Sequence, residues 1–163
     1  MKLFFLRHGE ADWPHWNKSD DERPLTDHGK EEMRKVAALL ERLAVSPDMI
    51  LTSPLPRAAQ TAEVVATKLK IGLQKEGLLT PGFKASKLKK LIGKHPADAL
   101  MIVGHEPDFS NVIAALTGGT VKLSKAGLAL VEIDDAGTRG RLLWLFPPKI
   151  ANTIATRSTL AKS

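Results

Sequence analysis

The chain has 163 residues, 43% hydrophobic and 26% charged, a composition typical of a soluble globular domain with a buried core. The absence of cysteine excludes disulfide bonds, thiol catalysis and thiolate metal sites, and the 24 lysines and arginines against 18 acidic residues favour anionic partners. The apolar run at residues 3–6 is too short for a signal peptide or a membrane span. We therefore expect one cytoplasmic domain over residues 1–163, with a core over residues 1–146 and a C-terminal tail at 149–163 that is given no function.

The N-terminal part of the sequence predicts a buried strand, a long polar loop and an amphipathic helix. Residues 2–6 form an unbroken apolar run with two phenylalanines, which is typical of a fully buried strand. Residues 7–25 are polar and contain two prolines, as in loops that carry function. A helix is expected to begin at Thr26, a suitable N-cap residue. Its apolar side chains follow the helical period, at Met33, Val36, Ala37, Leu40 and Leu43.

The rest of the sequence alternates strands and helices and ends in a hairpin. We expect strands over 49–51 and 99–103, helices over 58–69, 86–92 and 109–116, and hairpin strands over 128–133 and 141–146. This alternation predicts an α/β fold of three layers: a largely parallel central sheet, helices on both faces, and a C-terminal antiparallel hairpin. Two serines are expected to cap helices, Ser86 for the short third helix and Ser53 for the helix after Pro54, with a contact to the functional site as the alternative for Ser53.

Three of the predicted strands end in residues suited to chemistry. Arg7, His8 and Gly9 directly follow the first strand, Arg57 lies shortly after the second, and His105 follows the strand over 99–103 one residue later. Ligands of such sheets bind outside the carboxyl ends of the strands. We therefore expect two histidines and two arginines to meet at one edge of the sheet.

These residue types together indicate phosphoryl transfer. Guanidinium groups are always charged, and their forked donors match phosphate oxygens. A neutral imidazole is a competent nucleophile towards phosphorus, and a second histidine would add positive charge if it were protonated. Gly9 would let the backbone approach the anion closely. The sequence therefore predicts a covalent phosphohistidine intermediate that water later hydrolyses, with no metal and no cofactor.

Four motifs occur in a fixed order along the chain: LRHGEA at 6–11, RPLTDHG at 23–29, TSPLPRAAQTA at 52–62 and VGHEP at 103–107. In these motifs and their spacing the sequence resembles the histidine phosphatase superfamily, also called the phosphoglycerate-mutase-like family, from Met1 to about Phe146. The short length, the RPLT segment, the LTPG stretch at 79–82 and the absence of large insertions are similar to the small, SixA-type phosphohistidine phosphatases.

The resemblance implies roles for particular residues. His8 would be the nucleophile. The phosphoryl group would be held by Arg7, Arg57 and His105 as catalytic residues, with Gly9 and Arg23 beside them as substrate-binding residues. For Arg23, a salt bridge within the N-terminal loop is an equal alternative.

Departures from the family pattern favour one class of substrate. Ester-cleaving relatives often carry a glutamate general acid after the second helix, whereas this chain has GLLTPG at 77–82 with Glu76 displaced from the expected place. An alkoxide leaving group needs a proton donor, and an imidazole leaving group needs much less help. We therefore expect a phosphohistidine phosphatase that acts on a histidine-containing phosphotransfer protein. Four acidic residues of the loop stay open as proton donors: Glu10, Asp12, Asp20 and Asp21.

Two other functions stay open. The first is a broad-specificity phosphomonoesterase acting on small molecules, and the second is an inactive phosphoprotein-binding module. We expect a monomer that binds neither nucleic acid nor membranes. Trp13 and Trp16 would form the lip of the pocket or pack over an apolar edge. A run of lysines is a solvated face or a docking surface for an acidic phosphoprotein: Lys84, Lys87, Lys89, Lys90 and Lys94.

Overall fold

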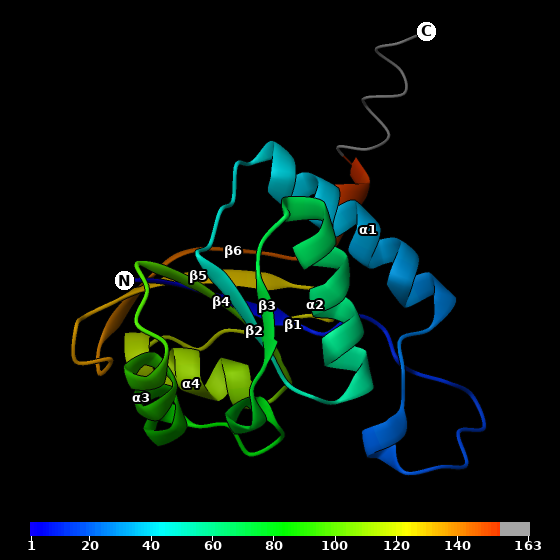
Figure 1. Cartoon of the computed structure of the whole chain (residues 1–163), viewed down its shortest axis with the longest axis horizontal. Coiled ribbons are helices and arrows are strands. Elements are labelled where there is room, and N and C mark those ends of the chain that lie inside the picture. The colour runs from blue at the N-terminus through cyan, green and yellow to red at the C-terminus, as the bar shows by residue number, and fades with distance from the viewer. Residues whose placement is uncertain (154–163) are drawn as a thin grey trace, which may run out of the picture.

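A computed structural model describes residues 1–153 and shows a six-stranded sheet flanked by helices (Figure 1). The strands are β1 (Lys2–Arg7), β2 (Met49–Thr52), β3 (Leu73–Lys75), β4 (Ala99–Gly104), β5 (Leu128–Ile133) and β6 (Gly140–Phe146). The α-helices are α1 (Asp27–Arg42), α2 (Pro56–Leu69), α3 (Ala85–Lys94) and α4 (Asp108–Thr117). Two short 3₁₀ helices are η1 (Asp20–Glu22) and η2 (Gly77–Leu79).

The order of strands across the sheet is β3-β2-β4-β1-β5-β6. The pairs β3–β2, β2–β4 and β4–β1 are parallel, whereas β5 runs antiparallel to β1 and to β6. The carboxyl ends of β1, β2 and β4 therefore lie side by side at one edge of the sheet. The predicted α/β fold, with a largely parallel sheet and a C-terminal antiparallel hairpin, is confirmed.

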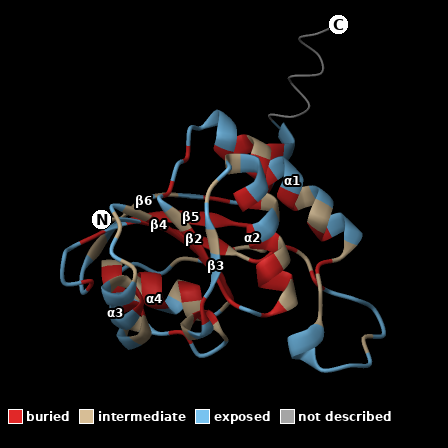
Figure 2. Cartoon of the chain, in the orientation of Figure 1, coloured by how far each residue is buried: buried red, intermediate tan, exposed pale blue. Residues whose placement is uncertain are grey.

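Helices cover both faces of the sheet, and the residues of β1 alternate between the two cores. Phe4 and Leu6 pack in the core beneath α1 and α2, whereas Leu3 and Phe5 pack in the core beneath α3 and α4. Figure 2 shows buried residues along the strands and on the sides of the helices that face the sheet. The alternation follows from the two-residue period of a strand, and burial of both faces explains why the apolar run is unbroken.

The N-terminus of α1 fixes the start of the long loop that follows β1. Thr26 caps the helix, as predicted, and its hydroxyl accepts a hydrogen bond from the Gly29 amide at 2.9 Å. A Cβ atom at Gly29 would lie 2.3 Å from the carbonyl oxygen of Glu10, so only glycine lets the loop pack this closely on the helix. The Glu10 carbonyl also accepts a hydrogen bond from the Thr26 amide at 2.9 Å. The glycine of the RPLTDHG motif therefore holds the loop against α1.

Two predicted helix caps are wrong, and one strand was missed. Ser86 lies inside α3, whose N-cap is Lys84, and Ser53 is not the N-cap of α2, because that position belongs to Leu55. Strand β3 was not predicted, since it is short and its residues Gln74 and Lys75 are exposed, as is usual for an edge strand.

The predicted tail falls partly outside the described residues. Residues 149–153 form a helical turn, and Ala151 at its centre is buried in the core beneath α1. The beginning of the tail is therefore docked on the domain. Within residues 1–153, no helix combines the length and the hydropathy needed to cross a membrane.

Candidate active site

The predicted site residues follow the strand ends that meet at one edge of the sheet. Backbone hydrogen bonds continue past the strands there: the His8 amide donates to the Gly104 carbonyl at 3.1 Å, and the Ser53 amide donates to the Val103 carbonyl at 3.0 Å. The ring centroids of His8 and His105 lie 5.3 Å apart. The structure therefore brings the two histidines together from neighbouring strands β1 and β4.

His8 is held as a neutral imidazole with one free nitrogen. Its side chain is buried, and Nδ1 lies 2.7 Å from the carbonyl oxygen of Gly9. A carbonyl oxygen can only accept, so Nδ1 carries the proton and Nε2 keeps its lone pair. Burial is the main cause that lowers the pKa of His8 to about 3, and the charges of Arg57 and Arg7 act in the same direction. At pH 7 this ring is ready to act as a nucleophile through Nε2.

His105 is also neutral at pH 7, although positive charge was the contribution considered for the second histidine. Burial lowers the pKa of His105 to about 4, and the charge of Arg57 acts in the same direction. Its Nε2 lies 2.9 Å from the hydroxyl oxygen of Ser53, which itself accepts a hydrogen bond from the Leu55 amide at 3.3 Å. The Ser53 hydroxyl can donate to Nε2, and in that tautomer Nδ1 carries the ring proton and can donate. Ser53 thus contacts the site, the alternative to its predicted capping role.

The three arginines of the site use only some of their donors within the protein. Arg7 Nη1 donates to the Leu123 carbonyl at 3.0 Å. Arg57 is 5% exposed, and both of its terminal nitrogens donate to Asp20. Arg23 also pairs with Asp20, at 2.6 Å. Burial lowers the pKa of Arg7 and of Arg57, but from so high a value that both stay charged at neutral pH.

Four buried side-chain nitrogens have no hydrogen-bond partner in the part of the chain that the structure describes, and all four belong to predicted site residues. They are the Nε atoms of Arg7, Arg23 and Arg57 and the Nδ1 atom of His105. A buried donor without a partner costs about 1–3 kcal/mol, so such groups are rare and call for a reason. The three cationic guanidinium groups, with the imidazole beside them, are suited to an oxyanion such as a phosphoryl group.

Gly9 has contacts within the protein, and its predicted approach to the anion stays a prediction. Its amide donates to the Thr61 hydroxyl at 3.0 Å, and that hydroxyl donates to the Arg57 carbonyl at 2.7 Å. A Cβ atom at Gly9 would lie 3.0 Å from the Met33 side chain, so a larger residue here would require Met33 on α1 to shift. Thr61, for which no role was predicted, therefore links the loop of His8 to the helix of Arg57.

Acidic residues of the loop are already engaged with other groups. Glu10 accepts hydrogen bonds from the Thr26 hydroxyl at 2.8 Å and pairs with His28 at 3.0 Å. Asp12 pairs with Lys125, and this hydrogen bond is the main cause that lowers the pKa of Asp12. Within residues 1–153, no three histidine, aspartate or glutamate side chains are grouped so that they could hold a metal ion.

Glu76 is held away from any role as a proton donor. Its carboxylate is 6% exposed and binds Lys94 at 2.7 Å and His95 at 3.0 Å, at the C-terminal end of α3. The hydrogen bond from Lys94 is the main cause that lowers the pKa of Glu76 to about 2. At neutral pH this group is therefore a carboxylate without a proton to give.

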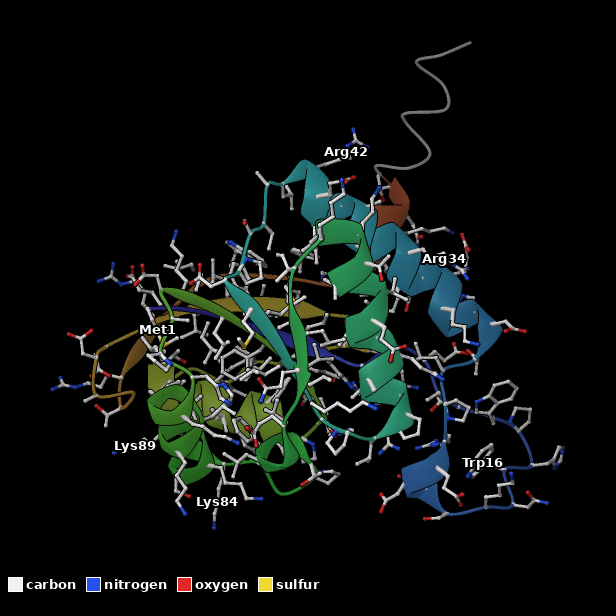
Figure 3. All side chains as sticks on the ribbon, in the orientation of Figure 1. Met1, Trp16, Arg34, Arg42, Lys84 and Lys89 are labelled. Carbon is white, nitrogen blue, oxygen red and sulfur yellow. The ribbon has the colours of Figure 1, made fainter. Side chains whose placement is uncertain are left out.

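The tryptophans of the loop and the lysines of α3 lie in separate places. Trp13 and Trp16 lie on the loop after β1, where their ring nitrogens donate to the carbonyls of Pro24 and Ser19. Figure 3 shows Trp16 beside η1, far from α3, where Lys84 and Lys89 point into solvent. The tryptophans thus brace their own loop through these bonds.

Comparison with known proteins decides the family. The family model of the histidine phosphatase superfamily (branch 1) matches residues 3–80. Phosphohistidine phosphatase SixA of Escherichia coli is 32% identical over 156 residues, covering 91% of this chain and 94% of that protein. The chain belongs to the histidine phosphatase superfamily. It is therefore a hydrolase with phosphatase activity, and the predicted resemblance is confirmed.

Other relatives agree with this membership. An uncharacterized protein of Picosynechococcus is 38% identical over 78% of this chain and 82% of its own length. The solved structure of the protein histidine phosphatase SixA complexed with tungstate has a TM-score of 0.80 and 28% identity, covering 92% of this chain and 99% of that one. The histidine phosphatase fold thus extends well beyond the segment matched by the family model.

Proposed function

We propose that this phosphatase removes the phosphoryl group from a phosphorylated histidine of a partner protein, by way of a phosphohistidine at His8 and without a metal ion. The similarity to SixA, which is named as a phosphohistidine phosphatase, supports this substrate class. In the proposed site, His8 is the nucleophile and Arg7, Arg57 and His105 hold the phosphoryl group. Arg23 binds at the same place.

The reaction proceeds in two displacements. Nε2 of His8 attacks phosphorus in line with the P–N bond of the substrate, and that bond breaks as the new one forms. The substrate imidazole leaves with the bonding electron pair and is neutral when its other ring nitrogen carries a proton. Water then attacks phospho-His8, releases inorganic phosphate and restores the free imidazole.

The free donors of the site match the charge that develops on the transferring group. The phosphoryl oxygens carry negative charge through the transition state, and catalysis of such transfers depends mainly on positioning and charge stabilisation. The guanidinium groups of Arg7, Arg23 and Arg57 and the imidazole of His105 would supply charge and donors for these oxygens, and one nitrogen of each has no partner within the described residues. The tungstate held by the related SixA structure is likewise a tetrahedral oxyanion.

The observation that carries the choice of substrate is the state of Glu76. This carboxylate is ionised and bound to Lys94 and His95, so it cannot protonate a leaving alkoxide. An imidazole leaving group needs much less help, because its other ring nitrogen can already carry a proton near neutral pH. The site is therefore better suited to breaking a P–N bond than the P–O bond of an ester.

A comparison of two substrates tests the proposal. Turnover of a phosphohistidine-containing phosphotransfer protein and of a simple phosphate monoester is measured side by side, with His8→Ala as the inactive control. We expect kcat/KM to favour the phosphohistidine protein. Faster turnover of the ester would instead identify a phosphomonoesterase. Tight binding of the phosphoprotein by both wild type and His8→Ala, without turnover by either, would identify a binding module.

A further inference from the structure

Asp20 makes direct contacts with two arginines of the site through three of its oxygen atoms. Its backbone carbonyl accepts from Arg57 Nη1 at 2.7 Å, and its Oδ2 atom accepts from Arg57 Nη2 at 3.1 Å. Its Oδ1 atom lies 2.6 Å from Arg23 Nη2. The first residue of η1 thus joins a helix residue and a loop residue that lie 34 positions apart in the sequence.

These contacts use one edge of the Arg57 guanidinium and leave another edge free. Both terminal nitrogens face Asp20, whereas the buried Nε atom has no partner, and the Nε atom of Arg23 is in the same state. A guanidinium group presents its donors in a rigid fork, so fixing one edge also fixes the direction of the other. Asp20 thereby determines where the free donors of Arg57 point.

The carboxylate of Asp20 is far more exposed than the guanidinium group that it binds. Its side chain is 63% exposed, while that of Arg57 is 6% exposed. The four unpartnered donors of the site remain unpartnered although Asp20 is bound to two of these residues. The contacts of Asp20 therefore leave these four nitrogens free.

We propose that Asp20 is a positioning residue that aligns Arg57 and Arg23 so that their remaining donors bind the phosphoryl group. The inference rests on the proposed role of these two arginines. The positive charges of Arg57 and Arg23 repel each other, and a carboxylate between them offsets that repulsion. The residue acts before the substrate arrives, and it touches no reacting atom.

Removing the Asp20 charge has two opposing effects on the affinity for phosphate. The larger of the two decides whether that affinity rises or falls. Loss of a negative charge near the site would by itself strengthen anion binding. Loss of alignment would weaken it, because the two guanidinium groups would separate and turn. If positioning dominates, Asp20→Asn raises the Kd of inorganic phosphate by about tenfold, the size expected for one charge-assisted hydrogen bond.

The experiment measures binding of inorganic phosphate by calorimetry to wild type, Asp20→Asn, Asp20→Glu and Asp21→Asn, with thermal unfolding of each variant as a folding control. Asp21 is the matched charge control, since it is the next residue of η1 and acts on Arg57 through its Coulomb field. We expect Asp20→Asn alone to lose affinity and Asp20→Glu, which keeps a carboxylate, to lie closer to wild type. Unchanged or tighter binding by Asp20→Asn would overturn the inference.

A double mutant shows whether Asp20 acts through Arg57. In the Arg57→Ala background, Asp20→Asn should weaken phosphate binding by a smaller factor than in wild type, since one of its two partners is gone. The inference would be overturned if Asp20→Asn weakened phosphate binding by the same factor in wild type and in Arg57→Ala. Phosphate binding does not depend on the nature of the leaving group. If the enzyme does not turn over the phosphohistidine protein but Asp20→Asn still weakens phosphate binding, the proposed substrate is refuted. The role of Asp20 would then still stand.

Discussion

The Nδ1 atom of His8 donates a hydrogen bond to the carbonyl oxygen of Gly9 at 2.7 Å. This bond fixes both the tautomer and the orientation of the ring, because only Nε2 remains to bind phosphorus. Together with burial, it keeps this imidazole neutral in the substrate-free protein, as the proposed nucleophile must be. The following predictions test this state and the contacts that support it.

The first prediction concerns the protonation of the two histidines. The pKa values of about 3 for His8 and about 4 for His105 are well below the ordinary value of 6.5, with burial as the main cause of both shifts. In the protein without ligand, both rings should stay neutral from pH 8 down to about pH 5. NMR of the imidazole nitrogens measures this directly and should show His8 with the proton on Nδ1. Titration of either ring near pH 6.5 would contradict the buried, neutral state.

The same shifts predict how stability changes with pH. The unfolded chain protonates these histidines near pH 6.5, whereas the folded chain does so only near pH 3 to 4. Between these limits the unfolded state binds more protons, so the free energy of unfolding must fall as the pH falls. Urea unfolding at pH 7 and at pH 4.5 measures the loss. Between these two pH values, the free energy of unfolding of a His8→Gln variant should fall by less than that of wild type. An equal fall would show that His8 does not contribute to the pH dependence.

The Thr61 hydroxyl supplies a third prediction. Thr61→Val keeps the shape of the side chain but leaves the Gly9 amide without its partner, and this should lower the free energy of unfolding by about 1–3 kcal/mol. Because Gly9 also holds the His8 ring, kcat/KM should fall about 10- to 100-fold. Thr61→Ser, which keeps the hydroxyl, is the matched control and should stay close to wild type. Equal behaviour of the two variants would refute the proposed link.

Two helical glycines should respond to alanine in opposite directions. At Gly29 a Cβ atom would lie 2.3 Å from the Glu10 carbonyl oxygen, so Gly29→Ala should destabilise the protein by about 1–3 kcal/mol. At Gly93 in α3 a Cβ atom would meet nothing within 4 Å, so Gly93→Ala should stabilise it by up to about 1 kcal/mol. Chemical denaturation of both variants compares the two effects. The packing argument fails if Gly29→Ala is as stable as Gly93→Ala.

The sequence allowed the main elements to be predicted because their periods are strong. Phe4 and Leu6 on β1, and Met33 and Val36 on α1, are buried as their spacing indicates. The parallel pairing of the strands was enough to predict that their carboxyl ends meet at one edge of the sheet. Strand β3 was missed because a short, exposed edge strand leaves no hydrophobic pattern.

Contacts between distant residues could not be predicted in the same way. Ser53 contacts His105 across 52 positions and Asp20 contacts Arg57 across 37, and neither distance follows from local sequence. A signal for Thr61 does exist, since it lies one helical turn after Arg57 on α2. The neutral state of His105 depends on its burial, which the residue type does not reveal.

The phosphorylated form of His8 is the most direct test of the account. A phosphohistidine protein with labelled phosphorus is mixed with the enzyme, the reaction is quenched within milliseconds at alkaline pH, and the label is mapped by mass spectrometry. The proposed mechanism predicts label on His8 in wild type and none on His8→Ala. Label on another residue, or rapid turnover with no labelled enzyme at any time, would contradict it.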